Sequence, residues 1–287
     1  MKLADKFAVV TGASHGLGLA IAHRFVQEGA SVLLCARTAS DLEAAAAQVR
    51  AASPPGSCVL VETVDVSSKT DVDRLAEIVQ KRFGKLDILV SNAGVVGPKG
   101  ASEQVDWGEW SRTISINLLG SVLCCRAFLP FLRQSPQGKI VLLSGGGATK
   151  PMPYFSAYAA SKAAVVRFGE TLAEELRETG IDVNCVAPGA LNTRMLEEVL
   201  EAGPEKVGRS YYEASVRQRE SGGASIESAA DLCLYLASSE SDGITGKLIS
   251  AVWDPWTEFA EHRQELQKTD VYTLRRIIPS ERGMHWG

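Results

Sequence analysis

The sequence has no surplus of basic residues: 30 Lys and Arg stand against 34 Asp and Glu among 287 residues, a net charge of −4. A nucleic-acid-binding protein normally carries a basic surplus, so this class, and nucleic-acid partners with it, are excluded early. No apolar run reaches the ~18 residues that a membrane-spanning helix needs. The first residues carry no signal-peptide pattern, and we expect no membrane association.

The chain also lacks a cysteine pattern for metal binding or disulfides. Its six cysteines include no C-x-x-C pair and are not accompanied by a histidine cluster, so we expect no metal site. Most of them lie in apolar runs, where a free cysteine acts as a small hydrophobic residue. This usage is typical of a reducing compartment and predicts a cytoplasmic protein.

Short apolar runs rich in β-branched residues alternate along the chain with helical stretches. Such runs are typical of a parallel sheet buried on both faces, and right-handed crossovers then give an open, doubly wound sheet. The sequence therefore predicts one α/β domain with about seven strands. The predicted strands cover residues 7–11, 31–36, 58–64, 86–91, 139–144, 181–187 and 247–252, and the predicted helices cover 17–28, 39–50, 68–83, 102–133, 158–178 and 226–237.

Two segments interrupt this alternation. Residues 190–223 contain no β-like run and follow the end of a predicted strand, where open α/β sheets bind ligands. We interpret them as a mobile substrate lid, with a helical surface excursion as the alternative. Residues 253–287 hold five aromatic residues, more than a disordered tail would carry. We therefore predict a domain at 1–252, lid included, and a C-terminal extension at 253–287 that packs against something.

A glycine-rich loop lies between the first predicted strand and the first predicted helix. Gly12 permits a tight turn, Gly16 lets the backbone approach a pyrophosphate, and Gly18 lets the helix pack on the strand. The helix N-terminus adds free N–H groups for phosphates. A glycine string is a weak signal by itself, but its place in a βαβ unit favours a dinucleotide site over a structural turn. The residues expected to line it are Gly12, Ser14, His15, Gly16, Leu17 and Gly18.

The end of the second predicted strand bears on which dinucleotide is bound. An NAD site places a carboxylate there for the ribose 2′-hydroxyl, but this position is Ala36, followed by Arg37. A guanidinium suits a 2′-phosphate, so NADP is favoured over NAD; a solvated surface arginine is the alternative. Asp65 and Val66, after the third strand, are candidates to bracket the adenine. Asp65 is equally a candidate N-cap or turn residue.

Tyr158 and Lys162 form a Y-x-x-x-K pattern in a predicted helix. Their i, i+4 spacing places both side chains on one helix face. A free tyrosine has a pKa of about 10, too high for acid–base work at neutral pH, and a nearby ammonium lowers it by stabilising the phenolate. Because the pattern occurs often by chance, it needs support from elsewhere in the chain.

That support comes from a series of motifs that spans about residues 5–252. Besides the glycine loop and the Tyr158–Lys162 pair, the series contains Asp65-Val66, Asn92-Ala93-Gly94, Asn117 and Pro188-Gly189-x-x-x-Thr193. In this series the chain resembles the short-chain dehydrogenase/reductase family, in its compact subgroup. The resemblance implies a Rossmann fold that binds NAD(P).

The resemblance also implies roles for the matched residues. Tyr158 would exchange a proton with a carbonyl or alcohol oxygen, Lys162 would lower its pKa and hold the nicotinamide ribose, and Asn117 would hold a water of the proton relay. Further residues would line the cofactor site: Asn92, Ala93, Gly94, Pro188, Gly189 and Thr193. The implied function is an NADP-dependent oxidoreductase that moves a hydride between the nicotinamide and a ketone or secondary alcohol. The implied assembly is a homodimer or homotetramer.

One position departs from the family pattern. The family's catalytic serine stands 13 residues before the tyrosine, and that position is Gly145 here. Ser144 is either a catalytic substitute or a structural cap at the end of a strand. The glycines at 145–147 either make room for a bulky substrate or offer backbone N–H groups to an oxyanion. Losing one polarising donor costs a few kcal/mol of barrier.

Two other function classes stay open on the sequence. The departure at Gly145 favours a non-catalytic NADP-binding sensor or partner protein, which the intact Tyr158, Lys162 and Asn117 oppose. A nucleotide-sugar-modifying enzyme of the same fold would usually have a longer chain and another glycine spacing. The substrate is a small molecule, either sugar-like or a hydroxyacyl or polyketide chain. The basic, aromatic extension either binds an anionic or sugar-like substrate beside the lid or packs against a neighbouring subunit.

Overall fold

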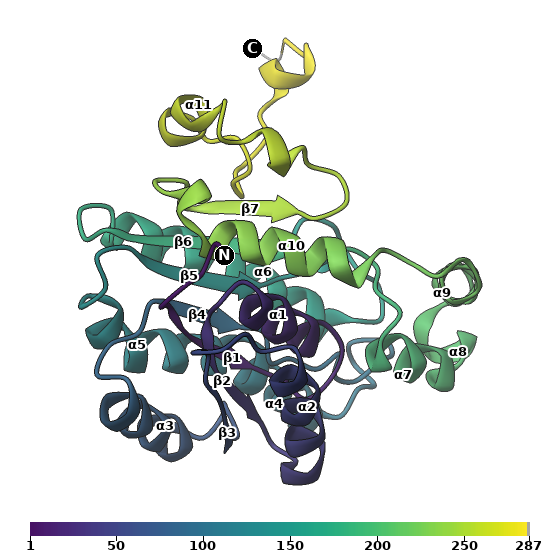
Figure 1. Ribbon diagram of the computed structural model, residues 1–287. Helices are drawn as coiled ribbons and strands as arrows, with labels where there is room; N and C mark the ends of the chain where they lie inside the picture. Colours follow the sequence, from purple (N-terminus) through teal and green to yellow (C-terminus); the bar gives the residue numbers. More distant parts are fainter. Residues whose placement is uncertain (286–287) are drawn as a thin grey trace.

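A computed structural model describes residues 1–285, and at its centre lies one parallel sheet in the order β3-β2-β1-β4-β5-β6-β7 (Figure 1). The chain moves outward from β1 to β3, then crosses back to β4 and moves outward in the other direction. Ligands of open α/β sheets bind beyond the strand ends at such a reversal, here between β1 and β4. The predicted doubly wound sheet is confirmed. Its strands are β1 (Phe7–Thr11), β2 (Ser31–Ala36), β3 (Val59–Thr63), β4 (Ile88–Ser91), β5 (Gly138–Leu143), β6 (Ile181–Ala187) and β7 (Lys247–Ser250).

Helices cover both faces of the sheet, each over its own core. Helices α1, α2 and α10 pack on one face and α3, α5 and α6 on the other. Along β1, Ala8 and Val10 join the first core and Val9 joins the second, because successive strand side chains point to opposite faces. This two-sided burial explains the continuous apolar runs. The helices are α1 (Gly16–Gln27), α2 (Ala39–Ala51), α3 (Lys69–Arg82), α4 (Trp107–Ile114), α5 (Gly120–Leu132), α6 (Ser156–Glu175), α7 (Arg194–Ala202), α8 (Pro204–Val207), α9 (Arg209–Ser221), α10 (Ile226–Ala237) and α11 (Arg263–Lys268).

The helix predicted from residue 102 begins instead at Trp107. Asp106 caps it, since its carboxylate accepts a hydrogen bond from the Glu109 N–H at 2.8 Å, and such caps fix helix starts. A π-helical turn, η1 (Ser115–Leu119), then joins α4 to α5. By length and composition Trp107–Leu132 would span a membrane, but 44% of its most apolar window is buried, and its Phe128 is fully buried in the second core. It is a core helix of the sheet.

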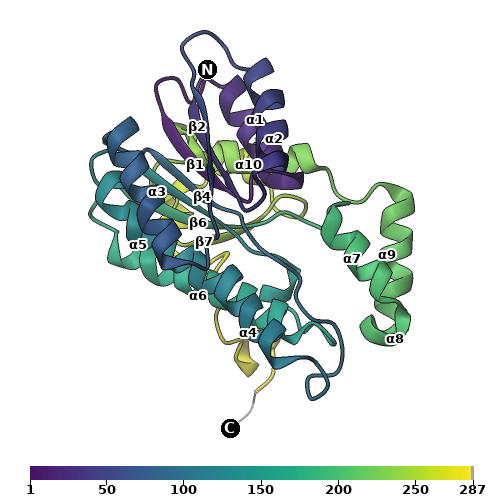
Figure 2. The same ribbon diagram turned by 90° about the horizontal axis from the view of Figure 1, so that it is seen from below.

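Residues 190–223, which we call the helical insert, form α7, α8 and α9 and project from the carboxyl edge of the sheet (Figure 2). A single parallel bridge between Leu191 and Ala224 closes the base of the insert. Val199 and Val207 of the insert pack with Val96 and Phe155 of the main body in a third, small apolar cluster. The insert is therefore helical and is fixed to the body by its own buried contacts.

The C-terminal tail, residues 253–285 as described, packs on its own chain. Phe259 and Leu266 are each 2% exposed and join the first core. Lys247 Nζ donates to the carbonyls of Thr269 and Val271 at 2.8 and 3.0 Å. The tail thus runs along β7, and Figure 1 shows α11 beyond β7, away from α7–α9. The interpretation that puts the tail beside the insert is therefore wrong; residues 286 and 287 of the predicted extension lie outside the described residues.

Candidate active site

The glycine loop has the geometry that its sequence predicts. Gly12 and Gly16 adopt left-handed backbone conformations, with φ of 64° and 53°, which glycine adopts without steric cost. A Cβ on Gly18 would lie 2.2 Å from the Gly12 carbonyl oxygen, so only glycine lets α1 pack this closely on the loop. His15 at the N-cap makes no side-chain cap, and the first turn of α1 holds no acidic residue. The helix N-terminus therefore keeps its N–H groups for a phosphate, and this loop fits a dinucleotide.

The end of β4 is tied to this loop by hydrogen bonds. The Asn92 side chain donates to the carbonyls of Thr11 and Gly12 at 2.9 and 3.1 Å. The backbone N–H groups of Asn92 and Ala93 both donate to the Thr11 hydroxyl at 3.0 Å. These bonds hold β1 and β4 together at the reversal point. Asn92 and Ala93 thus lie beside the glycine loop, and their place on the floor of a cofactor site stays a prediction.

The end of β2 lies beside the glycine loop, since Ala13 N–H donates to the Cys35 carbonyl at 3.1 Å. Ala36 is buried and Arg37 is exposed. The His15 ring forms a hydrogen bond between its Nδ1 and the Ser14 hydroxyl at 3.1 Å, and its Nε2 lies 4.0 Å from the carboxylate of Asp41. Asp41 was not among the predicted site residues. The one feature of the sequence that points to it is its position in the first turn of the second helix.

Asp65 adopts the turn arrangement among its three predicted alternatives. Its carboxylate accepts hydrogen bonds from the Ser67 N–H and hydroxyl at 2.9 and 2.6 Å, while Ser68 caps α3. Burial pushes the pKa of Asp65 upward, but the two Ser67 bonds and the nearby Arg37 charge bring it below its ordinary value. Val66 is buried and packs against Gly120, where a Cβ would lie 2.8 Å from it. Any contact of these two residues with adenine remains a prediction.

Tyr158 and Lys162 lie together on α6, as their spacing predicts. Lys162 Nζ is 5.8 Å from the centre of the Tyr158 ring and donates to the Leu143 carbonyl at 2.8 Å. Burial lowers the pKa of Lys162 to about 8. Burial, together with the nearby Tyr211, raises the pKa of Tyr158 to about 12. The phenol is therefore protonated at neutral pH, and Lys162 is mostly charged.

Asn117 stands in the π-helical turn η1 and faces the same region. Its side-chain NH₂ donates to the Val95 carbonyl and the Ser161 hydroxyl, both at 2.9 Å, and its oxygen accepts from Val95 N–H at 2.8 Å. A Cβ on Gly94 would lie 3.2 Å from Asn117 Oδ1 and 3.4 Å from Lys162 Nζ. The glycine thus lets Asn117 and Lys162 approach each other. π-helical turns are frequent at functional sites.

Ser144 and Gly145 differ sharply in what they face. The Ser144 hydroxyl is buried and donates to the Lys162 carbonyl at 3.3 Å, so it points into α6. Gly145 faces Tyr158: a Cβ built on it would lie 2.8 Å from the Tyr158 hydroxyl oxygen. The structure thus places Gly145, rather than Ser144, beside the Tyr158 hydroxyl.

The end of β6 completes the site. Pro188 and Gly189 follow the strand, and Gly189 has a φ of 92°. A Cβ on it would lie 2.6 Å from the Val252 side chain. Thr193 is the N-cap of α7 and lies over the glycine loop, 3.4 Å from where a Gly16 Cβ would stand. The predicted site residues of β1, β4, β5 and β6 therefore meet at one edge of the sheet.

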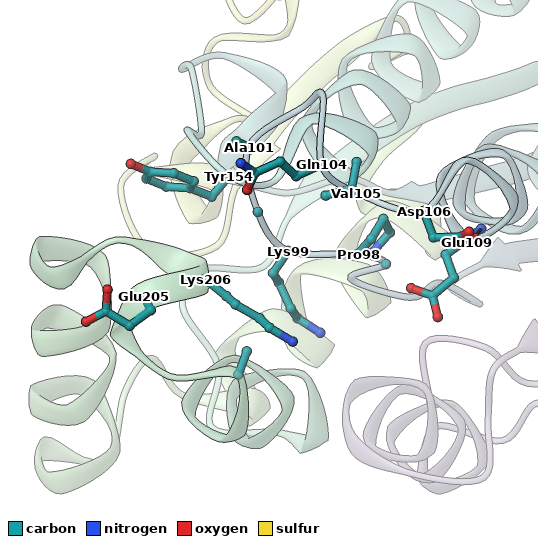
Figure 3. Close-up of a pocket in the computed structure, with 13 residues that line it drawn as sticks. Pro98, Lys99, Ala101, Gln104, Val105, Asp106, Glu109, Tyr154, Glu205 and Lys206 are labelled. Atoms are coloured by element: carbon teal, nitrogen blue, oxygen red, sulfur yellow. Dashed lines mark hydrogen bonds between the residues drawn. The ribbon is translucent and has the colours of Figure 1, made fainter.

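A cavity of about 490 Å³ opens between the loop after β4 and the helical insert (Figure 3). Lys99 and Lys206 extend into it from opposite sides, and Tyr154, just before α6, lies at its edge. Across residues 1–285 there is no group of three or more His, Cys, Asp or Glu side chains that could hold a metal ion. The cavity reaches Tyr154, four residues before Tyr158, while Tyr158 is not among the residues that line it.

The comparisons with known proteins agree with this geometry. The short chain dehydrogenase family model matches residues 6–203. The 3beta-hydroxysteroid dehydrogenase 1 of Eggerthella lenta is 39% identical over 247 residues, 85% of this chain and 91% of its own. The solved structure of NAD⁺-bound xylitol dehydrogenase has a TM-score of 0.77 at 28% identity, over 87% of this chain and 98% of that one. L-sorbose reductase from Gluconobacter frateurii, solved with NADPH and L-sorbose, has a TM-score of 0.77 at 30% identity, over 87% and 97%.

A Rossmann-type sheet with a glycine loop at a helix N-terminus and a Tyr–Lys pair on one helix face defines a nicotinamide-dependent oxidoreductase. The chain belongs to the short-chain dehydrogenase/reductase family. It is an enzyme acting on CH–OH or C=O groups with a nicotinamide cofactor.

Proposed function

We propose that this enzyme is an NADP-dependent carbonyl reductase that also oxidises the matching alcohol, with Tyr158 as the proton donor or acceptor. The observation that carries the proposal is the pairing of the partly buried Tyr158 with the buried Lys162 on α6, at the strand ends beside the glycine loop. The nicotinamide supplies the hydride. An intact acid–base pair is not needed by a non-catalytic sensor, so that alternative loses its support.

The protonation state of Tyr158 supports reduction as the direction at neutral pH. With its pKa raised to about 12 by burial, the phenol carries the proton that a new alkoxide must receive. After the transfer, the Lys162 ammonium stabilises the phenolate. Oxidation needs the phenolate first, and burial opposes its formation. The Leu143 carbonyl holds Lys162 in place for this step.

The choice of NADP rests on the end of β2. Ala36 offers no group for a ribose hydroxyl, and the exposed Arg37 and His15 are available for a 2′-phosphate. Among similar structures, xylitol dehydrogenase is bound to NAD⁺ and L-sorbose reductase to NADPH, so the family uses both. Fluorescence titration tests the choice: we expect NADPH to bind about tenfold or more tighter than NADH, as charge-assisted contacts would give. Equal affinities, or tighter NADH, would overturn it.

For the substrate we propose a small or medium-sized ketone or secondary alcohol. The helical insert forms one wall of the cavity beside Tyr154, which supports a role as a substrate lid. The enzyme is to be mixed with NADPH and a panel of a cyclic ketone, an aromatic ketone, a 3-oxoacyl thioester and a ketose. We expect at least one to consume NADPH with formation of the alcohol. If the enzyme reduces none of these four compounds, the result counts against the proposal.

We propose a homodimer or homotetramer assembled through α5 and α6, as the family resemblance implies. Leu119 is 49% exposed on this face, and Val122, Leu123 and Phe168 are half-buried. Other apolar residues of these helices face the sheet and belong to the second core instead: Phe128, Val165, Val166 and Leu172. A monomer by light scattering at micromolar concentration would contradict this assembly.

The six free thiols, five of them buried, support our proposal of a cytoplasmic location.

A further inference from the structure

No side chain of β5 supplies a hydroxyl beside Tyr158. Gly145 has extended backbone angles, φ 177° and ψ 174°, which any residue adopts, so the backbone does not require glycine there. A side chain at this position would crowd Tyr158, because a Cβ would stand 2.8 Å from the Tyr158 hydroxyl oxygen. The Ser144 hydroxyl donates its hydrogen bond to the Lys162 carbonyl, and the residue is 3% exposed. Apart from the backbone N–H groups of residues 145–147, a second donor for the substrate carbonyl therefore has to come from another element.

The helical insert brings such a donor to the site. Tyr211 stands in the first turn of α9, and its ring packs on Phe155 with the centroids 4.8 Å apart and the planes tilted by 51°. Phe155 is three residues before Tyr158 and lies with it in the third apolar cluster. The Phe155 contact therefore places Tyr211 on the side of α6 that carries the catalytic phenol.

The start of α9 is fixed rather than loosely attached. Val207, directly before it, is fully buried against Phe155 and Val96. Gly208, with a φ of 81°, lies so close to Tyr154 that a Cβ would stand 2.9 Å from its ring. These contacts connect α9 to the segment just before α6. They hold the first turn of α9, with Tyr211, beside the segment that leads into Tyr158.

The Tyr211 hydroxyl is free to act. Within residues 1–285 it makes no hydrogen bond, and the residue is 42% exposed. Burial raises the pKa of Tyr211, and the nearness of Tyr211 contributes to the raised pKa of Tyr158. Two phenols that share a small space behave in this way. Both are protonated at neutral pH, so both can donate.

We propose that Tyr211 donates a hydrogen bond to the substrate carbonyl oxygen and fills the role of the hydroxyl that is missing at position 145. This inference rests on the proposed role of Tyr158. In the reduction, the carbonyl carbon accepts the hydride, the C=O π electrons move to oxygen, and oxygen takes the proton of Tyr158. Tyr211 keeps its proton and stabilises the negative charge that develops on oxygen.

The direct test compares Tyr211→Phe with Tyr212→Phe, its neighbour on α9. Both variants keep the ring and remove one hydroxyl. NADPH consumption is measured with cyclohexanone, acetophenone, acetoacetyl thioester and L-sorbose. For the ketone that the wild type reduces fastest, we expect Tyr211→Phe to lower kcat by about 10²-fold, as for other single oxyanion donors, with NADPH affinity unchanged. Tyr212→Phe should stay within about twofold. A Tyr211→Phe enzyme within a few-fold of wild type overturns the inference.

A second readout does not depend on the substrate. The tyrosinate absorbance of wild type, Tyr158→Phe and Tyr211→Phe is followed as the pH is raised. Removing Tyr211 takes away a group that raises the pKa of Tyr158, so Tyr158 should titrate at lower pH in that variant. An unchanged Tyr158 titration contradicts the inference. The two failures are distinguishable: if Tyr158→Phe is also fully active, the proposed function fails, and if only Tyr158→Phe is inactive, the role of Tyr211 alone fails.

Discussion

The two sides of the site follow the family to different degrees. The cofactor side, at the ends of β1 and β4, keeps the expected residues, and hydrogen bonds from Asn92 and Ala93 fix it to Thr11 and Gly12. The substrate side, at the end of β5 and under the insert, has Gly145 where the family pattern has its serine, and this glycine lies against the Tyr158 phenol. Cofactor binding constrains a fixed set of contacts, whereas the substrate side can move a donor from the sheet to the insert.

The largest effect is expected where the two sides meet. Tyr158→Phe keeps the ring but removes the proton, so turnover should fall by about 10²–10⁴-fold, while NADPH affinity should not change. Steady-state kinetics and cofactor titration measure the two quantities on the same preparation. Turnover within tenfold of wild type would show that the proton comes from another group.

The variant Gly145→Ser puts a serine back at the position where the family has one. It tests whether the substrate side of this enzyme works without that serine. In Gly145→Ser, the new Cβ would collide with the Tyr158 hydroxyl at 2.8 Å. Overpacking of this kind costs about 1–3 kcal/mol of folding stability. Because it also pushes the Tyr158 hydroxyl out of position, we expect kcat to fall by roughly tenfold or more. Gly146→Ala is the matched control, because a Cβ there meets nothing within 4 Å. A faster Gly145→Ser enzyme would mean that the site lacks a donor and that the phenol can move aside.

On the cofactor side, Arg37→Ala should act on selectivity alone. Removing a charge-assisted contact to the 2′-phosphate costs about 1.5–3 kcal/mol, so the preference for NADPH over NADH should shrink by roughly tenfold or more. The affinity for NADH should stay the same. An unchanged ratio of the two dissociation constants would identify Arg37 as a surface residue.

The rates of reduction and oxidation should change with pH in opposite directions, each by about a few-fold. Burial lowers the pKa of Lys162 to about 8, so its ammonium is present below that pH and is lost above it. Reduction, which leaves a phenolate beside Lys162, should slow as the pH rises through about 8. Oxidation needs Tyr158 deprotonated and should speed up with pH. Initial rates in both directions across one pH series measure this, and parallel profiles would contradict the assignment.

Most of the fold and the cofactor side could be predicted because their signals are local in sequence. The strands read as continuous apolar runs since both faces of the sheet are covered. Gly12, Gly16 and Gly18 act within one loop, and Tyr158 and Lys162 within one helix. In such cases the spacing along the chain fixes the spacing in the structure.

The substrate side could not be predicted in the same way. The packing of Tyr211 on Phe155 joins residues far apart in the chain, and it depends on how the insert folds back onto α6. The direction of the Ser144 hydroxyl depends on how β5 meets α6, so the sequence left two alternatives. The path of the tail is likewise set by long-range contacts, such as Leu274 N–H donating to Glu170 at 2.6 Å.

The most direct measurement is kcat for Ser144→Ala and Tyr211→Phe, side by side with the same ketone. Ser144 makes a buried hydrogen bond to the Lys162 carbonyl, so its loss should lower the free energy of unfolding by about 1 kcal/mol and leave kcat within a few-fold. Tyr211→Phe should lose about 10²-fold in kcat with stability little changed. The reverse pattern, with kcat lost in Ser144→Ala and kept in Tyr211→Phe, would contradict the claim that the polarising hydroxyl has moved from the sheet to the insert.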